Sequence, residues 1–267
     1  MTLSVCVAGV TGSVGRPLAE AVLAAGDLQL RSAVSRSVSG DLGEAWGGEP
    51  NGVPVFGRVG DALDGVDVLV DYTSHLAVRD NTLTALERGV AVVVGASGLS
   101  AQDFDDIDAA ARAAGVGVVA AGNFSLTAAM GQAAALLVAP HLPSWEIIDY
   151  ASAGKPDSPS GTASELAERL ASVAPPRVEI PVDQTSGRVE ARGANVAGTQ
   201  VHSLRLPSFA VSTEIVFALP DERLVIRHDA GSSAAPYLAG TLLAVRRVTG
   251  VTGLIRGLDT MLLNGPS

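Results

Sequence analysis

The sequence predicts an α/β fold in two domains, the first built on a parallel sheet and the second an α+β domain with a mixed sheet. Up to about residue 122, short apolar runs alternate with helical stretches of about 10–15 residues, which is typical of parallel strands joined by crossover helices. After Pro175, segments with strand character follow one another and helices become rare. We therefore expect one domain from residues 1–122 and 235–267, and another from residues 123–234.

The first domain reads as a succession of strands and helices. Apolar runs bounded by turn residues predict strands over residues 3–9, 28–34, 66–72, 90–94 and 116–120. Helical periodicity predicts helices over residues 16–25, 76–88 and 104–114. The run over 66–72 is strongly apolar, so we expect it near the centre of the sheet, where both faces are buried.

The second domain begins with a helical stretch and ends in strands. We expect a helix over 126–138, a strand over 145–150, a loop rich in Gly, Pro and Ser over 151–161, and a helix over 162–171. Strand character then returns over residues 178–182, 199–206, 212–218 and 223–228. The last amphipathic segment, 235–248, is helical and could dock on either domain.

Composition excludes several classes of site. The chain has 267 residues, with Cys6 as its single cysteine and four scattered histidines. We therefore expect neither a disulfide scaffold nor a metal site, and the lone thiol fits a reducing cytoplasm.

The charge and the hydropathy pattern exclude two classes of partner. Lys and Arg number 18 against 28 Asp and Glu, a formal net charge of −10, which disfavours nucleic acid. The longest apolar stretches are broken well before the ~20 residues that a membrane span needs, and no signal-peptide pattern opens the chain. We expect a soluble, cytoplasmic protein without membrane contact.

A glycine-rich turn joins the first strand to the first helix. It reads Gly9-Val10-Thr11-Gly12-Ser13-Val14-Gly15. Glycines in such a turn let the backbone approach a pyrophosphate, which then lies at the helix N-terminus. We expect this turn to bind a dinucleotide through Gly9, Thr11, Gly12, Ser13, Val14 and Gly15, although tight packing alone also uses glycine.

The end of the second strand indicates which dinucleotide. Ser35, Arg36 and Ser37 stand where an acidic residue usually accepts hydrogen bonds from the ribose of NADH. A guanidinium and two hydroxyls suit a 2′-phosphate better. We therefore expect NADPH, with NADH as a second option, unless Arg36 is merely an exposed surface arginine.

Two further strand ends carry candidate cofactor contacts. Tyr72 and Thr73 follow the apolar strand over 66–72, at the edge where α/β ligand crevices lie. Gly95-Ala96-Ser97-Gly98 follows the strand over 90–94 and could face the nicotinamide or be a simple turn. Asp71 stands at the same strand end as Tyr72 and Thr73, and its alternative role is to cap the next helix.

The segment Lys155-Pro156-Asp157-Ser158-Pro159-Ser160-Gly161-Thr162-Ala163 is the most unusual of the chain. Two prolines stiffen a loop that carries a lysine, and Ser160, Gly161 and Thr162 open a helix whose N–H groups could bind a carboxylate. Lys155 would add positive charge. An ordinary capped helix behind a rigid loop is the alternative.

Together these motifs resemble the 4-hydroxy-tetrahydrodipicolinate reductase family, also called dihydrodipicolinate reductase, of the diaminopimelate route to lysine. The likeness runs in order through residues 9–15, 71–73, 95–98, 122–125, 155–163, 224–229 and 240–248. It implies a Rossmann-like cofactor domain and a substrate domain whose sheet builds a homotetramer. The implied reaction is hydride transfer from NAD(P)H to a cyclic, carboxylated imine or enamine.

The resemblance also implies roles for single residues. Arg36 matches the arginine that faces the 2′-phosphate, and Gly95 and Gly98 bracket the loop near the nicotinamide. Asn123 and Phe124 match residues that line the interdomain cleft of the family. Gly161 and Thr162 match the pair that binds a substrate carboxylate, and Lys155 matches the catalytic lysine.

The departures from the family pattern lie at the substrate end. The family usually reads Glu-x-His-His-x-x-Lys, and here that register has Ala151 and Ser152 in place of the two histidines. Ala151 cannot act as the proton donor, so Lys155 would deliver the proton, with Ser152 holding a water or a carboxylate oxygen. Further changes are GASG at 95–98 for GTTG, Gly122 for proline, and Ser-Thr-Glu at 212–214 for His-Gln-Glu.

Three functions remain open at this point. The first is an NADPH-preferring reductase of the lysine-pathway intermediate. The second keeps the fold and the hydride chemistry but acts on a different imine or carbonyl acid. The third is a catalytically silent NADPH-binding protein, which the loss of the histidines motivates.

Overall fold

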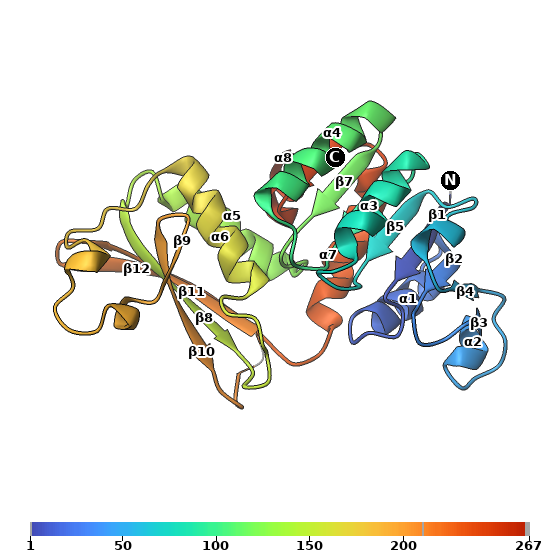
Figure 1. The fold of residues 1–267 in the computed structure, drawn as a ribbon, viewed down its shortest axis with the longest axis horizontal. Helices are drawn as coiled ribbons and strands as arrows, with labels where there is room; N and C mark the ends of the chain where they lie inside the picture. The colour runs from blue at the N-terminus through green and yellow to red at the C-terminus, as the bar shows by residue number, and fades with distance from the viewer. Residues whose placement is uncertain (1, 210, 265–267) are drawn as a thin grey trace. The chain divides into compact units, whose positions relative to one another are not determined.

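The structure, a computed structural model, describes residues 2–209 and 211–264 (Figure 1). The chain divides into two compact units. The first comprises Met1–Leu126 with Ala234–Ser267, and the second comprises Thr127–Ser233. In the described part of the chain, no helix is long and apolar enough to cross a bilayer.

The first unit is built on an eight-stranded sheet in the order β13-β7-β6-β5-β1-β2-β4-β3. Its strands are β1 (Leu3–Ala8), β2 (Leu28–Val34), β3 (Gly40–Asp41), β4 (Pro54–Phe56), β5 (Val68–Asp71), β6 (Ala91–Val94), β7 (Gly117–Ala120) and β13 (Gly253–Arg256). All neighbouring pairs are parallel except β3 with β4. The predicted parallel sheet is therefore confirmed, and β5 lies in its interior as expected.

Apolar runs explain why β1, β5, β6 and β7 lie in the interior of the unit. Every residue of β5, β6 and β7 is buried, as are the last four residues of β1. Parallel strands covered on both faces need such continuous apolar runs. The core cluster around Leu69, Val92 and Val118 joins three neighbouring strands.

Helices of the first unit are α1 (Gly15–Ala24), α2 (Leu42–Ala45), α3 (Val78–Glu87), α4 (Ala101–Ala114), α7 (Ala235–Val248) and α8 (Leu258–Asn264), with a 3-10 turn η1 (Val59–Asp61). α4 begins three residues before the predicted Phe104. Ser100 and Asp103 form a capping box, in which the Ser100 side chain accepts from the Asp103 N–H and the Asp103 carboxylate accepts from the Ser100 N–H. This cap stabilises the additional turn.

The C-terminal segment belongs to the first unit. β13 pairs in parallel with β7, although the sequence pattern predicted no strand there. Helix α7 packs on β6 and β7. Arg246 of α7 also donates two hydrogen bonds to Asp27, the residue before β2.

The second unit has a five-stranded sheet in the order β12-β11-β8-β10-β9. Its strands are β8 (Ser144–Ala151), β9 (Ala194–Val196), β10 (Thr199–Arg205), β11 (Val211–Leu219) and β12 (Glu222–Ala230). β10 and β8 are parallel and the other pairs antiparallel, so the sheet is mixed, as predicted.

Two helices accompany this sheet, α5 (Leu126–Val138) and α6 (Gly161–Val173). Alternate residues of β8 are buried, and Trp145 and Ile147 pack in one cluster with Leu166 and Leu170 of α6 and with Phe217 of β11. This alternation gives β8 one face toward the core.

The prediction of a strand over residues 178–182 is wrong. The segment has no regular structure up to a 3-10 turn η2 (Val182–Gln184), and a second turn η3 (Val189–Arg192) follows. Pro175, Pro176 and Pro181 flank it, and proline has no N–H for a strand ladder. Ile180 is 61% exposed, so the apolar pattern here does not mark a buried face.

Candidate active site

The glycine-rich turn after β1 requires glycine at both ends. Gly9 has φ of +86°, and a Cβ there would lie 2.5 Å from the Tyr72 carbonyl oxygen. A Cβ on Gly15 would lie 2.1 Å from the Gly9 carbonyl oxygen. The Gly12 N–H donates to that same carbonyl at 2.8 Å. The turn is therefore tight, and residues 11–13 are exposed.

The N-terminus of α1 has the features of an anion site. Val14 precedes the helix and provides no side-chain cap, and the first turn holds no acidic residue. Its N–H groups thus lack a side-chain acceptor from the cap position, and the helix dipole favours negative charge there. These residues fit the pyrophosphate of a dinucleotide.

Hydroxyls cluster beside Arg36 at the end of β2. The Ser35 hydroxyl lies 3.2 Å from the Thr11 hydroxyl and 3.1 Å from the Ser37 hydroxyl. Arg36 is exposed and makes no hydrogen bond or ion pair with any residue in 2–209 or 211–264. The guanidinium and three hydroxyls together fit a phosphate monoester.

Asp71 organises the loop after β5. Its Oδ1 accepts hydrogen bonds from the Thr73 N–H at 2.7 Å and the Thr73 hydroxyl at 2.6 Å. Its Oδ2 accepts from the Asn81 side chain at 2.8 Å. Helix α3 is instead preceded by Ala77. Asp71 therefore positions Thr73 and does not cap the helix.

The loop over residues 95–98 packs against that segment. A Cβ on Gly95 would lie 2.3 Å from the Tyr72 ring, and one on Gly98 would lie 2.3 Å from the His75 Cβ. The Tyr72 hydroxyl lies 2.8 Å from the Thr241 hydroxyl. Burial raises the pKa of Tyr72, so the phenol stays protonated. Ser97 is exposed and Ala96 partly so.

Sheet order brings these candidate residues to one edge. The glycine turn, residues 35–37, residues 72–73 and residues 95–98 follow β1, β2, β5 and β6, which are neighbours in the sheet. Ligands of open α/β sheets bind at the carboxyl ends of the strands. The four segments are thus placed where one extended ligand can contact them all.

Asn123 and Phe124 are both buried. The Asn123 Oδ1 accepts a hydrogen bond from the Ser125 N–H at 2.8 Å. Phe124 is 1% exposed, and its ring meets the Tyr72 ring edge-on at 6.2 Å. The Phe124 ring is therefore a core group, so a cofactor could reach only the backbone at this position.

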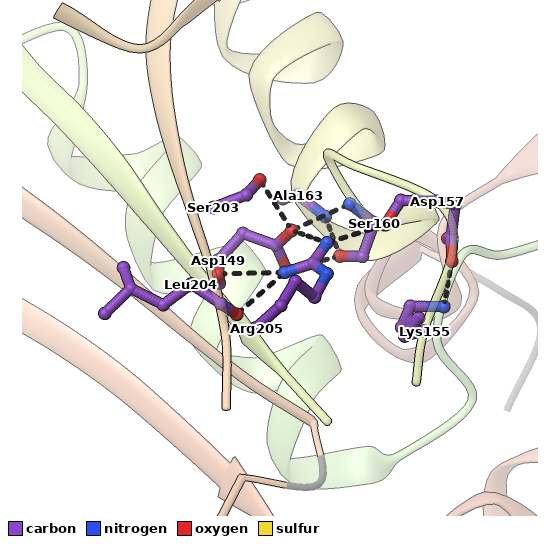
Figure 2. Close-up of polar contacts among 8 residues, drawn as sticks. All are labelled: Asp149, Lys155, Asp157, Ser160, Ala163, Ser203, Leu204 and Arg205. Carbon is purple, nitrogen blue, oxygen red and sulfur yellow. Dashed lines mark hydrogen bonds and ion pairs between the residues drawn. The ribbon is translucent and has the colours of Figure 1, made fainter. Parts of the chain in front are cut away.

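A second group of polar residues surrounds Asp149, on β8 of the second unit. Figure 2 shows its carboxylate between Ser160 and Arg205. The Ser160 N–H donates to Oδ2 at 2.8 Å and the Ser160 hydroxyl to Oδ1 at 2.7 Å. Asp149 Oδ2 also accepts from the Arg205 Nη2 at 2.8 Å and from the Ser203 hydroxyl at 3.2 Å. Asp149 is only 1% exposed, so this carboxylate is a buried anchor.

The charge of Asp149 is stabilised by these partners. Burial by itself raises the pKa of Asp149, but the hydrogen bonds from Ser160 and the Arg205 guanidinium outweigh burial. The pKa therefore lies below the ordinary aspartate value. Asp149 is ionised at neutral pH and pairs with Arg205.

Arg205 also holds the loop that carries the lysine. Its Nη2 donates to the backbone carbonyl of Asp157 at 2.7 Å (Figure 2). The Asp157 side chain in turn lies 2.8 Å from the Lys155 Nζ. Lys155 is partly exposed and is the single lysine in the sequence.

Ser160 caps α6 and so sets the direction of its N-terminus. The Ser160 hydroxyl accepts from the Ala163 N–H at 3.3 Å while it donates to Asp149. Ser160 is 3% exposed, so its side chain is used within the protein rather than for a ligand. Gly161 and Thr162 follow in a first turn without acidic residues, which fits a carboxylate ligand.

The two residues that stand in place of the family's histidines, Ala151 and Ser152, differ in solvent exposure. Ala151, the last residue of β8, is 1% exposed, whereas Ser152 is exposed. The Ser152 backbone carbonyl accepts from the Lys155 N–H at 3.0 Å. Only Ser152 of this pair can present its side chain to a ligand from the surface.

Sequence reasoning missed Asp149, Ser203 and Arg205. Asp149 takes a buried position in the alternation of β8, after Trp145 and Ile147, and a charged residue at such a position is the signal that could have found it. Lys155 is the single lysine among 18 basic residues, which is a second signal, since it marks the loop that Arg205 holds.

Comparison with known proteins follows the same two-part division. Residues 3–124 match the family described as "Dihydrodipicolinate reductase, N-terminus", and residues 122–262 match "Dihydrodipicolinate reductase, C-terminus". The 4-hydroxy-tetrahydrodipicolinate reductase of Moorella thermoacetica is 35% identical over 267 residues, 98% of each chain. That of Thermosynechococcus vestitus is 35% identical over 272 residues, 97% of each chain.

Solved structures show the same fold. A dipicolinate-bound dihydrodipicolinate reductase from Paenisporosarcina sp. TG-14 superimposes with a TM-score of 0.78 at 26% identity, over 98% of this chain and 100% of that one. An amine dehydrogenase from Mycobacterium smegmatis gives a TM-score of 0.64 at 14% identity, over 96% of this chain and 95% of that one, and so shares the fold alone. Because the matches to family and relatives span nearly the whole sequence, the chain belongs to the dihydrodipicolinate reductase family.

Proposed function

We propose that this protein is an NAD(P)H-dependent reductase that transfers hydride to a cyclic, carboxylated imine, with 4-hydroxy-tetrahydrodipicolinate of the lysine pathway as its substrate. The observation that carries this proposal is the buried Asp149–Ser160–Arg205 network. It holds the N-terminus of α6 and the loop bearing Lys155 in a chain of this family. The relatives named above carry the activity in their names.

We assign the cofactor to the carboxyl edge of the first sheet. The N-terminus of α1 would hold the pyrophosphate of the cofactor, and Thr73 and residues 95–98 would contact the rest of the cofactor. Arg36 and the hydroxyls of Thr11, Ser35 and Ser37 favour NADPH over NADH. No carboxylate follows β2 directly, where NADH enzymes place one.

The reaction needs a hydride on carbon and a proton on nitrogen. When bound, the reduced nicotinamide supplies the hydride. Gly161 and Thr162 would bind one substrate carboxylate through their N–H groups, which orients the C=N bond. The Lys155 ammonium would then donate its Nζ proton to the substrate nitrogen as the C=N bond becomes CH–NH. Ser152 would hold a water or a carboxylate oxygen beside it.

The family also suggests how the protein assembles and where it works. We propose a homotetramer built through the sheet of the second unit and a cytoplasmic location, since the activity named for the relatives is biosynthetic. Sedimentation of the purified protein tests the assembly.

A different substrate remains the second candidate. The observation that favours it is the pair Ala151 and Ser152, since Ala151 is buried and neither side chain can act as a histidine would. Under this proposal the protein reduces another carboxylated imine or carbonyl acid. A panel of such compounds, assayed with NADPH, separates the two candidates by their kcat/KM ratio.

The deciding experiment follows NADPH oxidation with freshly generated 4-hydroxy-tetrahydrodipicolinate. We expect turnover by the wild-type protein and a kcat reduced roughly 10²- to 10⁴-fold in Lys155→Ala, the usual worth of a positioned proton donor. Lys155→Arg keeps the charge but cannot release a proton at neutral pH, so it should be as inactive as Lys155→Ala. Full activity of Lys155→Arg would contradict proton donation. NADPH binding without turnover of any panel compound would instead indicate a catalytically silent protein.

A further inference from the structure

The Lys155 ammonium is paired with a carboxylate of its own loop. Its Nζ lies 2.8 Å from the Asp157 Oδ1 (Figure 2). The Lys155 side chain is 32% exposed and that of Asp157 is 41% exposed, and ion pairs with such exposure contribute only ~0–1 kcal/mol to folding. The ion pair therefore adds little to the stability of the fold.

The backbone between the two side chains favours this pairing. Pro156 stands between Lys155 and Asp157, and its ring fixes φ at about −65°. A residue before proline is restricted to extended backbone, and side chains two residues apart in an extended chain point to the same side. The loop thus presents the ammonium and the carboxylate on one side.

Asp157 is held in turn by the buried network around Asp149. Its backbone carbonyl accepts from the Arg205 Nη2 at 2.7 Å, and the same nitrogen donates to the Asp149 Oδ2 at 2.8 Å. Asp149 is 1% exposed. Through Arg205 and Asp157 the Lys155 ammonium is connected to a buried anchor. A flexible four-carbon side chain, which would otherwise sample many rotamers, is thereby held in one place.

The same contacts balance the positive charges of this region. Arg205 pairs with Asp149, and Lys155 pairs with Asp157. Asp157 also stands three residues before Ser160, the N-cap of α6, where its negative charge opposes a second anion. A carboxylate at this helix end would therefore be bound by N–H groups and the helix dipole, and the paired ammonium remains a proton donor rather than a counter-ion.

We propose that Asp157 is a positioning residue, which holds Lys155 for proton donation and keeps its charge from binding a carboxylate. The inference rests on the proposed function, because the proton moves in the reaction assigned there. In that step the Lys155 Nζ–H bond breaks as the proton bonds to the substrate nitrogen, while the carbon of the C=N bond accepts the hydride. Lys155 then regains a proton from water, and Asp157 stays ionised without contacting the substrate.

Asp157→Asn tests this role by moving two quantities in opposite directions. The variant keeps the size of the side chain and removes its charge, which releases the ammonium. We expect kcat with 4-hydroxy-tetrahydrodipicolinate and NADPH to fall roughly 10- to 100-fold, the cost of a misplaced catalytic group. Pyridine-2,6-dicarboxylate should bind roughly 3- to 10-fold more tightly, because one like charge is gone and one ammonium is free. A merely structural role would weaken both.

Two further variants frame this result. Asp157→Glu restores the carboxylate, so it should recover part of kcat and return the dicarboxylate affinity toward that of the wild type. Asp183→Asn is the matched control, because Asp183 is another exposed aspartate of the second unit, and we expect it to leave both quantities unchanged. Thermal unfolding confirms that each variant is folded.

The ion pair can also be measured without turnover, because Lys155 is the single lysine in the sequence. Trinitrobenzenesulfonate modifies amines, and peptide mass spectrometry distinguishes a label on Lys155 from one on the α-amino group. We expect Lys155 to react several-fold faster in Asp157→Asn than in the wild type or Asp183→Asn. The reason is that the carboxylate pairs with the ammonium and repels the anionic reagent.

The outcomes separate the positioning role from the function. An unchanged labelling rate or an unchanged kcat in Asp157→Asn, or a parallel loss of kcat and dicarboxylate affinity, would overturn the positioning role and leave the proposed function standing. A wild-type protein without turnover would overturn the proposed function and the positioning role with it, even where labelling confirms the ion pair.

Discussion

Asp149 and Ser160 are joined by two hydrogen bonds, one from the Ser160 N–H at 2.8 Å and one from its hydroxyl at 2.7 Å. The pair ties the middle strand of the second sheet to the N-terminus of α6. It therefore fixes the direction in which the N–H groups of Gly161 and Thr162 point, and the proposed carboxylate site depends on it.

Replacing Asp149 by Asn should destabilise the second unit by about 3–5 kcal/mol, because it leaves the largely buried Arg205 without its counter-charge. The side chains of the pair are 1% and 16% exposed. Urea unfolding measures the loss. Asp157→Asn is the control, since Asp157 is 41% exposed and an exposed pair contributes only ~0–1 kcal/mol. Equal losses in both variants would contradict the anchor role of Asp149.

The same carboxylate predicts a pH dependence of the free energy of unfolding. Its pKa in the folded protein lies below the value of about 3.9 for an unfolded aspartate. Its stabilising contribution is therefore complete above that value and is lost as the pH falls through the lower folded pKa. We expect the stability gap between wild type and Asp149→Asn to be constant at higher pH and to narrow below about pH 4. A gap that widens on acidification would contradict this.

Arg36 should decide between the two dinucleotides. In Arg36→Ala we expect NADPH to bind roughly 10- to 100-fold more weakly, the worth of hydrogen bonds to a charged group, and NADH to bind unchanged. Nicotinamide fluorescence titration measures both. Arg58→Ala provides a control, because Arg58 is another exposed arginine of the first unit. An equal loss for NADPH and NADH would show that Arg36 does not contact a 2′-phosphate.

Histidine should be accepted at position 152 and resisted at position 151. Ala151 is 1% exposed at the end of β8, between Val211 and Arg205 in the register of the sheet. Ala151→His should lower the free energy of unfolding by about 1–3 kcal/mol through overpacking, whereas Ser152→His on the surface should stay within about 0.5 kcal/mol. Thermal unfolding of both variants checks this. A neutral Ala151→His would mean that the strand end has room for the missing ring.

Local sequence pattern was sufficient for most of the elements. The ranges predicted for 28–34, 126–138 and 235–248 are those of β2, α5 and α7, because apolar periodicity and helix caps are local signals. The strand predicted over 178–182 does not form, because apolar residues without a neighbouring strand cannot make the hydrogen-bond ladder of a sheet. β13 was missed because its pairing partner, β7, lies more than a hundred residues earlier in the chain.

The sequence by itself determined the two-part α/β pattern, the glycine turn and the proline-containing loop around Lys155, because each depends on residues that are contiguous in the chain. Only the tertiary structure decided that Asp149, Ser160 and Arg205 form one buried network, because strand pairing brings together residues 56 positions apart. It also decided that the Ser160 hydroxyl, which donates to Asp149, caps helix α6 by accepting from the Ala163 N–H. Burial and hydrogen-bond partners are properties of packing, which no single segment of the chain encodes.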